Sequence, residues 1–175
     1  AIIPTEQVAD LSKLDDSGQV CLYAYGAATH LVVDVSGYFP PGARFTALTP
    51  GRLLDTRAEG LTVDGNGQGD GPVEPGSPIE VPVGDRHGVP AGASAAVLNV
   101  TAVNTGGAGF LTVFPCDQDK PWASNVNFVT TGEITPNLVV SKLSADGSIC
   151  LDAGVSPTDV VVDLIGYFPA VADYV

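Results

Sequence analysis

The chain has 175 residues, of which 45% are hydrophobic and only 15% are charged, a composition that predicts one folded domain or one domain plus a fragment. Its 20 acidic and 7 basic residues give a formal net charge of -13, which disfavours binding to nucleic acid and to anionic membrane surfaces. No apolar run is long enough for a spanning helix, so we expect no membrane insertion.

Short segments in which apolar and polar residues alternate predict β-strands along most of the chain. The first is 30–39, where Leu31, Val33, Val35 and Phe39 share one face. The other candidates, in chain order, are 79–83, 95–103, 109–115, 124–130, 138–143, 148–152 and 158–168. Short strands separated by turn residues, without helical periodicity, predict an all-β fold. We expect an antiparallel β-sandwich of jelly-roll or Greek-key type rather than a closed barrel.

The segment 158–168 shows this alternation over its whole length. A period of two is typical of a strand with one buried and one solvated face. We expect the apolar face to pack in the core together with Leu98 and Val100. The residues predicted to point into the core are Val160, Val162, Leu164 and Phe168, and those predicted to point away are Asp159, Asp163 and Tyr167.

An internal repeat is the strongest organisational signal. Residues 12–40 align without a gap to residues 141–169, with 15 identities in 29 positions. The offset of 129 residues is too long for a solenoid unit and predicts that a whole domain is repeated. We therefore expect a piece of a longer product in which a complete repeat follows half of another. The expected divisions are an orphan second half at 1–40, a linker at 41–44, a complete copy at 45–169, and a further repeat start or C-terminal tail at 170–175.

A series of short motifs accompanies this repeat. Leu53-Leu54-Asp55-Thr56-Arg57 is followed by the segments 88–93, 97–101, 109–113, 124–128 and 159–168. The series resembles the "LLDTR" tandem repeats of secreted and cell-surface proteins of actinobacteria and other bacteria. The resemblance covers 45–169, and its second half covers 12–39. It implies a repeat that occurs in arrays or beside secreted hydrolases, and it carries no catalytic residues over to this chain.

Three cysteines leave two pairings open. Cys116 and Cys150 would belong to the complete copy, whereas Cys21 lies in the orphan half. We expect a Cys116–Cys150 disulfide with Cys21 unpaired, and the alternative is a Cys21–Cys116 bond. Disulfides, together with 21 Gly, 14 Pro and scarce lysine, favour an extracellular or cell-surface location.

The motif Asp55-Thr56-Arg57 is the most conspicuous polar cluster. An arginine fork can grip a carboxylate or a sugar, so a binding site is one interpretation. The favoured interpretation is a structural ion pair that joins Arg57 to Asp34 or Asp163.

The glycine-rich stretch 64–71 spaces oxygen-bearing side chains at Asp64, Asn66 and Asp70. Calcium loops have similar spacing, but the glutamate that should close an EF-hand is replaced by Pro75. We expect a hairpin loop without a cofactor, and calcium is the alternative.

Trp122 follows a predicted strand and has acidic and amide neighbours. Such a tryptophan can stack on a sugar, or it can close the end of a sandwich as an apolar lid. Tyr23 and Tyr25 are further candidates for sugar contacts.

No nucleophile with a neighbouring base is evident, because no serine lies in a Gly-x-Ser-x-Gly setting and the chain has only two histidines. We therefore do not expect an enzyme. The expected function is that of a non-catalytic extracellular structural or adhesive β-module in a surface array or filament, assembling by strand complementation. Its partners would be copies of itself or neighbouring repeats. The alternative is a carbohydrate-binding module that accompanies a secreted hydrolase and takes polysaccharide as its partner.

Overall fold

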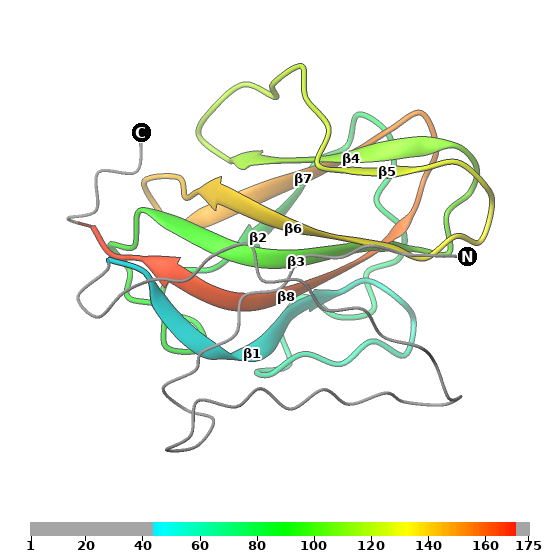
Figure 1. The fold of residues 1–175 in the computed structure, drawn as a ribbon. Helices are drawn as coiled ribbons and strands as arrows, with labels where there is room; N and C mark the ends of the chain where they lie inside the picture. The colour runs from blue at the N-terminus through cyan, green and yellow to red at the C-terminus, as the bar shows by residue number, and fades with distance from the viewer. Residues whose placement is uncertain (1–43, 171–175) are drawn as a thin grey trace, which may run out of the picture.

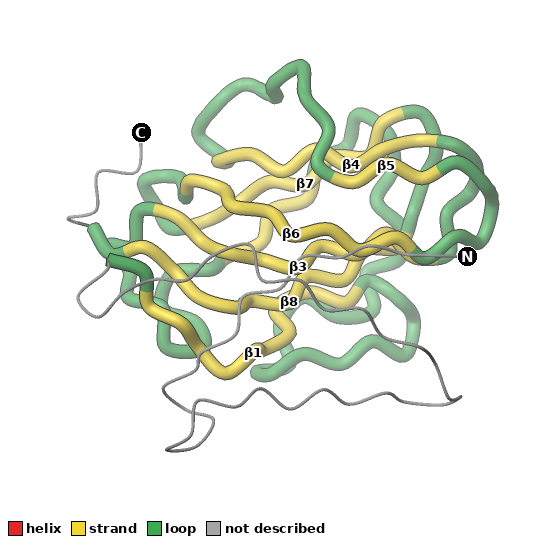
Figure 2. The backbone as a smooth tube through the Cα atoms, in the orientation of Figure 1, coloured by secondary structure: helices red, strands yellow, loops and turns green. Residues whose placement is uncertain are grey.

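The computed structural model describes residues 44–170, which form eight β-strands and no helix (Figures 1 and 2). In this part of the chain there is accordingly no helix that is long and apolar enough to cross a membrane. The predicted half-repeat, with Cys21, Tyr23, Tyr25 and Asp34, lies outside the described residues. The strands are β1 (Thr46–Asp55), β2 (Ile79–Pro82), β3 (Ala95–Val103), β4 (Gly109–Pro115), β5 (Val126–Phe128), β6 (Thr135–Lys142), β7 (Ser148–Gly154) and β8 (Asp159–Phe168).

The strands form two four-stranded sheets packed face to face. The first sheet has the order β1-β8-β3-β6 and the second has the order β2-β7-β4-β5, and all neighbouring strands are antiparallel. Most connections cross from one sheet to the other, which gives the double Greek key of a jelly roll. The predicted β-sandwich is confirmed.

The hydrophobic core lies between the two sheets. Every other residue of β3, and of β8 as far as Leu164, points into it, as expected for half-buried strands. The side chains that are fully buried here are Leu98, Val100, Val160, Val162 and Leu164. The second sheet contributes to the same cluster from its inner face, with Leu111, Val113, Ile149, Leu151 and Ala153. The predicted inward direction of the valines of β8 therefore agrees with the structure.

The end of β8 departs from the predicted alternation. The pairing of β8 with β3 shifts between Gly166 and Leu164, so Ile165 is an extra residue in the strand. Such a bulge reverses the faces of the residues that follow it. Tyr167 therefore packs against the core, whereas Phe168 stacks on Phe45 with ring centroids 5.5 Å apart. The prediction that Phe168 faces the core and Tyr167 faces away is wrong for this reason.

Two further elements differ from the sequence prediction. The sequence does not predict β1 as a strand, because Pro50 and Gly51 interrupt its alternation. In the structure, the pairing of β1 with β8 shifts register twice. The predicted strand 124–130 is reduced to the three residues of β5, because it pairs with only part of β4.

Candidate functional site

The outer face of the first sheet carries two apolar side chains that are buried. In β3, Ala96, Leu98 and the alternate residues after them belong to the core, so Val97 points to the opposite side of the sheet. Val161 of β8 does the same for the same reason. Val97 is 2% exposed and Val161 is 4% exposed, although neither belongs to the core between the sheets. On this side, which we call the outer face of the first sheet, these two valines are thus withdrawn from water, whereas Val140 of β6, which pairs with Val97, is 39% exposed.

An ion network crosses this outer face. The guanidinium of Arg52 binds Asp163 with both Nε and Nη2, at 2.8 and 3.2 Å, and reaches Asp55 at 3.2 Å. Arg57 binds the other side of Asp55 with Nε and Nη2, at 2.8 and 2.6 Å. We call these four residues the arginine network. It ties β1 to β8 in a fixed register.

Of the two predicted partners of Arg57, Asp163 is corrected, and Asp34 lies outside the described residues. Asp163 binds Arg52 from the facing position of β1, and Arg57 binds Asp55, two residues before it. The residue that sequence reasoning missed is Arg52. Its signal was its place directly before the Leu53-Leu54 pair, but the register of β1 and β8 was needed to connect it with Asp163.

The electrostatics of the arginine network follow from these contacts. The side-chain hydrogen bonds from Arg57 hold the pKa of Asp55 below its ordinary value, although burial opposes this shift. Asp163 and Asp55 in turn raise the pKa values of Arg52 and Arg57, respectively. The carboxylate of Asp55 is 1% exposed and is bound on both sides by guanidinium groups. It therefore acts as a structural anion and does not present itself to a ligand.

Thr56, the central residue of the motif, is also structural. It is fully buried, its hydroxyl donates to Asp159 at 2.9 Å, and the backbone N–H of Val160 donates to the same hydroxyl oxygen at 2.9 Å. Asn104 donates to the second oxygen of Asp159. The structure thus favours the structural interpretation of Asp55-Thr56-Arg57 over the ligand-binding one.

In the glycine-rich loop, the carboxylate of Asp64 is paired with an arginine from outside the loop, Arg86. Arg86 donates two parallel hydrogen bonds of 2.8 Å to Asp64, and it further donates to the backbone carbonyls of Pro82 and Leu53. These bonds hold the pKa of Asp64 well below its ordinary range. Both oxygens of Asp64 bind Arg86, and Oδ1 also accepts a hydrogen bond from the backbone N–H of Asn66 at 3.1 Å, so this carboxylate is satisfied by donors of the protein itself. Within residues 44–170, no three His, Cys, Asp or Glu side chains are grouped as a metal ligand set.

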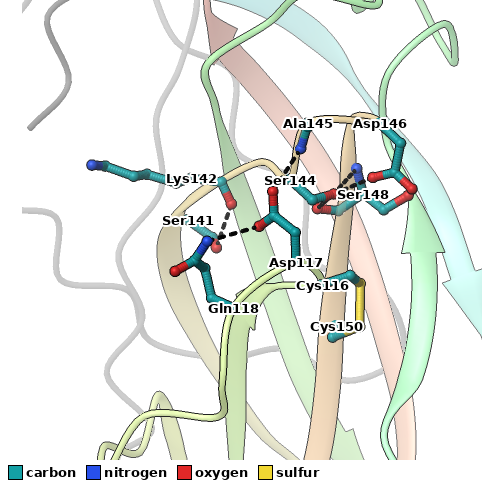
Figure 3. The surroundings of a disulfide bond; sticks show 10 residues. All are labelled: Cys116, Asp117, Gln118, Ser141, Lys142, Ser144, Ala145, Asp146, Ser148 and Cys150. Atoms are coloured by element: carbon teal, nitrogen blue, oxygen red, sulfur yellow. Dashed lines mark hydrogen bonds between the residues drawn. A yellow bond between two sulfur atoms is a disulfide. The ribbon is translucent and has the colours of Figure 1, made fainter.

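The predicted disulfide between Cys116 and Cys150 is present and links the end of β4 to the middle of β7 (Figure 3). Directly after it, the carboxylate of Asp117 accepts a hydrogen bond from the backbone N–H of Ala145, in the turn between β6 and β7, at 3.0 Å. Figure 3 shows this carboxylate between Ala145 and the amide of Gln118. These contacts fix the start of residues 116–125, which we call the Trp122 loop.

The remainder of the Trp122 loop lies over the outer face of the second sheet. Thr112 of β4 donates to the carbonyl of Ala123 at 2.7 Å. At the end of the loop, the backbone N–H of Asn125 donates to Leu111, and its side-chain oxygen accepts from Val113. In Figure 1 the loop is the yellow-green segment that projects beyond β4 and β5. It is thus anchored at both ends.

A groove of about 510 Å³ lies along this loop. Its polar edge is an ion pair in which Lys120 donates to Asp152 at 2.6 Å, and Asp152 also accepts from the backbone N–H of Gly76. Trp122 itself is fully exposed. We call the following set the Trp122 groove: Phe110, Lys120, Pro121, Trp122, Ala123 and Ser124.

Sequence reasoning identified only Trp122 of this groove. Phe110, Lys120 and Asp152 come from separate parts of the chain, and no short motif connects them. Their relation depends on the pairing of β4 with β7, which sets Phe110 opposite Gly154 and Thr112 opposite Asp152. Gly154 is required there, because a β-carbon at this position would lie 2.2 Å from the Phe110 ring.

No protein-family model matches the chain, and no curated protein matches it.

Proposed function

We propose that the chain is a non-catalytic structural or adhesive β-module of an extracellular array, and that it assembles with equivalent β-structure through the outer face of the first sheet. The observation that carries this proposal is the burial of Val97 and Val161 on the side away from the core. We take this burial to support a close-packed cover over these valines.

The sequences of the two central strands support a covered outer face. An antiparallel strand with one solvated face alternates between apolar and polar residues, whereas a strand covered on both faces has consecutive apolar residues. Strand β8 contains Val160-Val161-Val162 followed by Leu164-Ile165, and β3 contains Ala95-Ala96-Val97-Leu98. Apolar surface left in water costs about 25 cal/mol per Å². Several uncovered valine and isoleucine side chains would therefore cost several kcal/mol.

The half-repeat at residues 8–39 is the occupant that we propose for this face, from the same chain or from a neighbouring one. Its sequence is that of a second copy of the region that contains β7 and β8, including the alternate apolar residues Leu31, Val33 and Val35. A segment with this pattern needs a complementary apolar surface as much as the outer face does. The two requirements match.

Three sequence features support the extracellular setting. The surface is strongly acidic, the fold contains a disulfide, and the motif series resembles the LLDTR repeats of secreted and cell-surface proteins. These features agree with a module that is repeated along a surface array.

Deletion of residues 1–40 tests the proposal. We expect the remaining chain to expose the outer face of the first sheet, bind a fluorescent apolar dye and aggregate in size-exclusion chromatography. The intact chain is then measured at several concentrations. If the cover comes from the same chain, the elution volume stays constant, whereas it changes with concentration if the cover comes from a neighbouring chain. A deletion variant that is monomeric and as stable as the intact chain would contradict the proposal.

A further inference from the structure

The Trp122 groove combines two properties that rarely occur together. The indole of Trp122 is fully exposed, although an exposed tryptophan leaves a large apolar area in water. At the same time, the loop that carries it is anchored by a disulfide, by Asp117 at its start and by Thr112 and Asn125 near its end. The backbone that carries the indole is therefore held at both ends of the loop. A ligand that stacks on the indole loses little binding energy to ordering of the protein.

Polar groups for hydrogen bonding lie beside this apolar platform. Lys120 has three N–H donors and uses one of them on Asp152, which holds the ammonium group in position. Asp152 is 3% exposed and is itself fixed by the backbone N–H of Gly76. The same ammonium lies 5.7 Å from the centre of the Phe110 ring. The groove thus offers an indole face, a positioned cationic donor with spare N–H groups, and the hydroxyl of Ser124.

We propose that the Trp122 groove binds a neutral pyranose unit of a polysaccharide, with the indole stacked on the sugar ring and Lys120 donating to its hydroxyl groups. A pyranose with equatorial hydroxyls has an apolar C–H face that fits an indole and a rim of hydroxyls that accept and donate hydrogen bonds. The sugar is neutral, because the loop also carries Asp117 and Asp119 and the chain has a net charge of -13, which repels acidic polymers. The volume of about 510 Å³ is within the range of small-molecule sites.

This site is separate from the proposed assembly surface. It lies over the second sheet, whereas assembly is proposed at the outer face of the first sheet. The inference does not rest on the proposed function. Loss of sugar binding and loss of assembly can therefore be observed independently.

Trp122 is the only tryptophan of the chain, so its fluorescence reports directly on the groove. The probes are cellohexaose and chitohexaose, whose rings have equatorial hydroxyls, with mannohexaose and polygalacturonate as the axial and acidic comparisons. We expect the first two to change the emission of Trp122 in a saturable manner, and the last two to have little effect. The intact chain is used throughout.

Matched variants assign the binding to the proposed groups. Retention on insoluble cellulose or chitin should fall roughly tenfold or more for Trp122→Ala, but much less for Trp122→Phe, which keeps an aromatic face. Lys120→Ala should weaken binding without abolishing it. Val129→Ala is the control, because it removes an equally simple exposed apolar group, 73% exposed, outside the groove. Circular dichroism of each variant verifies that it is folded.

Two results would overturn the inference. One is an emission of Trp122 that none of the neutral oligosaccharides changes, together with equal retention of the intact chain and Trp122→Ala. The other is an emission that changes with protein concentration and not with sugar, which would assign Trp122 to a protein–protein contact.

Discussion

The two sheets of the sandwich share one core, but their outer faces are built in opposite ways. The outer face of the first sheet has small branched residues, Val97 and Val161, that are buried, and its charged groups neutralise one another in the arginine network. The outer face of the second sheet has its own cover, the Trp122 loop, and this cover places a fully exposed indole in water. This contrast is the reason why we propose a protein partner for the first face and a sugar for the second.

The polar groups of the two faces differ in the same sense. Asp55 on the first face is bound on both sides by arginines, so its carboxylate is taken up by the arginine network. Lys120 on the second face is bound by one carboxylate and keeps spare donors. Asn99, in the middle of the first face, has a buried side-chain oxygen without a hydrogen-bond partner among the described residues. A covering layer is in a position to supply a donor to it.

A charge placed in the core that the two sheets share should have the largest effect on stability. Val162→Asp places an unpaired charge between the sheets, at a position that is 0% exposed. We expect a loss of about 5 kcal/mol or more, comparable with the whole stability of a small domain, and therefore failure to fold. Val129→Asp, at an exposed position, is the matched control. Expression of soluble Val162→Asp protein with an unchanged melting temperature would show that the strand register is wrong.

Loss of the disulfide should affect mainly the second face. The Cys116–Cys150 bond closes a separation of 34 residues, so its removal should lower the free energy of unfolding by about 3 kcal/mol. Reduction, or the double variant Cys116→Ser with Cys150→Ser, tests this by urea denaturation. The Trp122 loop should also lose its fixed start, so that the fluorescence anisotropy of Trp122 falls. EDTA should leave the stability unchanged, since Asp64 binds Arg86. Destabilisation by EDTA without destabilisation by the reductant would reverse the assignment.

A smaller effect is expected from acid on the first face. The pKa of Asp55 is lower in the folded chain than its ordinary value of 3.8, so the unfolded chain takes up the proton first. This carboxylate therefore contributes stability above about pH 4, and the contribution is lost as the pH falls through the folded pKa. The carboxylate of Asp64 acts in the same direction. Urea midpoints measured from pH 6 to pH 2 should decline, and Asp64→Asn should flatten the decline. A midpoint that rises on acidification of the intact chain would contradict the arginine pairs.

Much of the fold could be predicted from the sequence, because alternation marks strands whose inner faces are apolar. The strands at 95–103 and 109–115 agree with β3 and β4 residue by residue. The bulge at Ile165 could not be predicted, since the consecutive apolar residues Leu164 and Ile165 do not show where the alternation shifts. It reversed the assigned faces of Tyr167 and Phe168.

The sites were harder to predict than the strands. Charge alone predicts Asp34 or Asp163 as the partner of Arg57, and only the register of β1 on β8 shows that Arg52 faces Asp163. The Trp122 groove depends on strand pairing in the same way, because Asp152 follows Lys120 by 32 residues. Charge and residue type identify candidates, but the partner is selected by register.

Thiol labelling tests the covered outer face of the first sheet most directly. Single cysteines are introduced by Val97→Cys, Val162→Cys and Val129→Cys in the intact chain, each with Cys21→Ser, and their reaction with a maleimide is timed. Val162 is in the core and Val129 is 73% exposed, so the two set the slow and fast limits. If the outer face is covered, the thiol at position 97 should react as slowly as the one at position 162. Reaction as fast as at position 129 would show that this face is open to solvent and would contradict assembly through it.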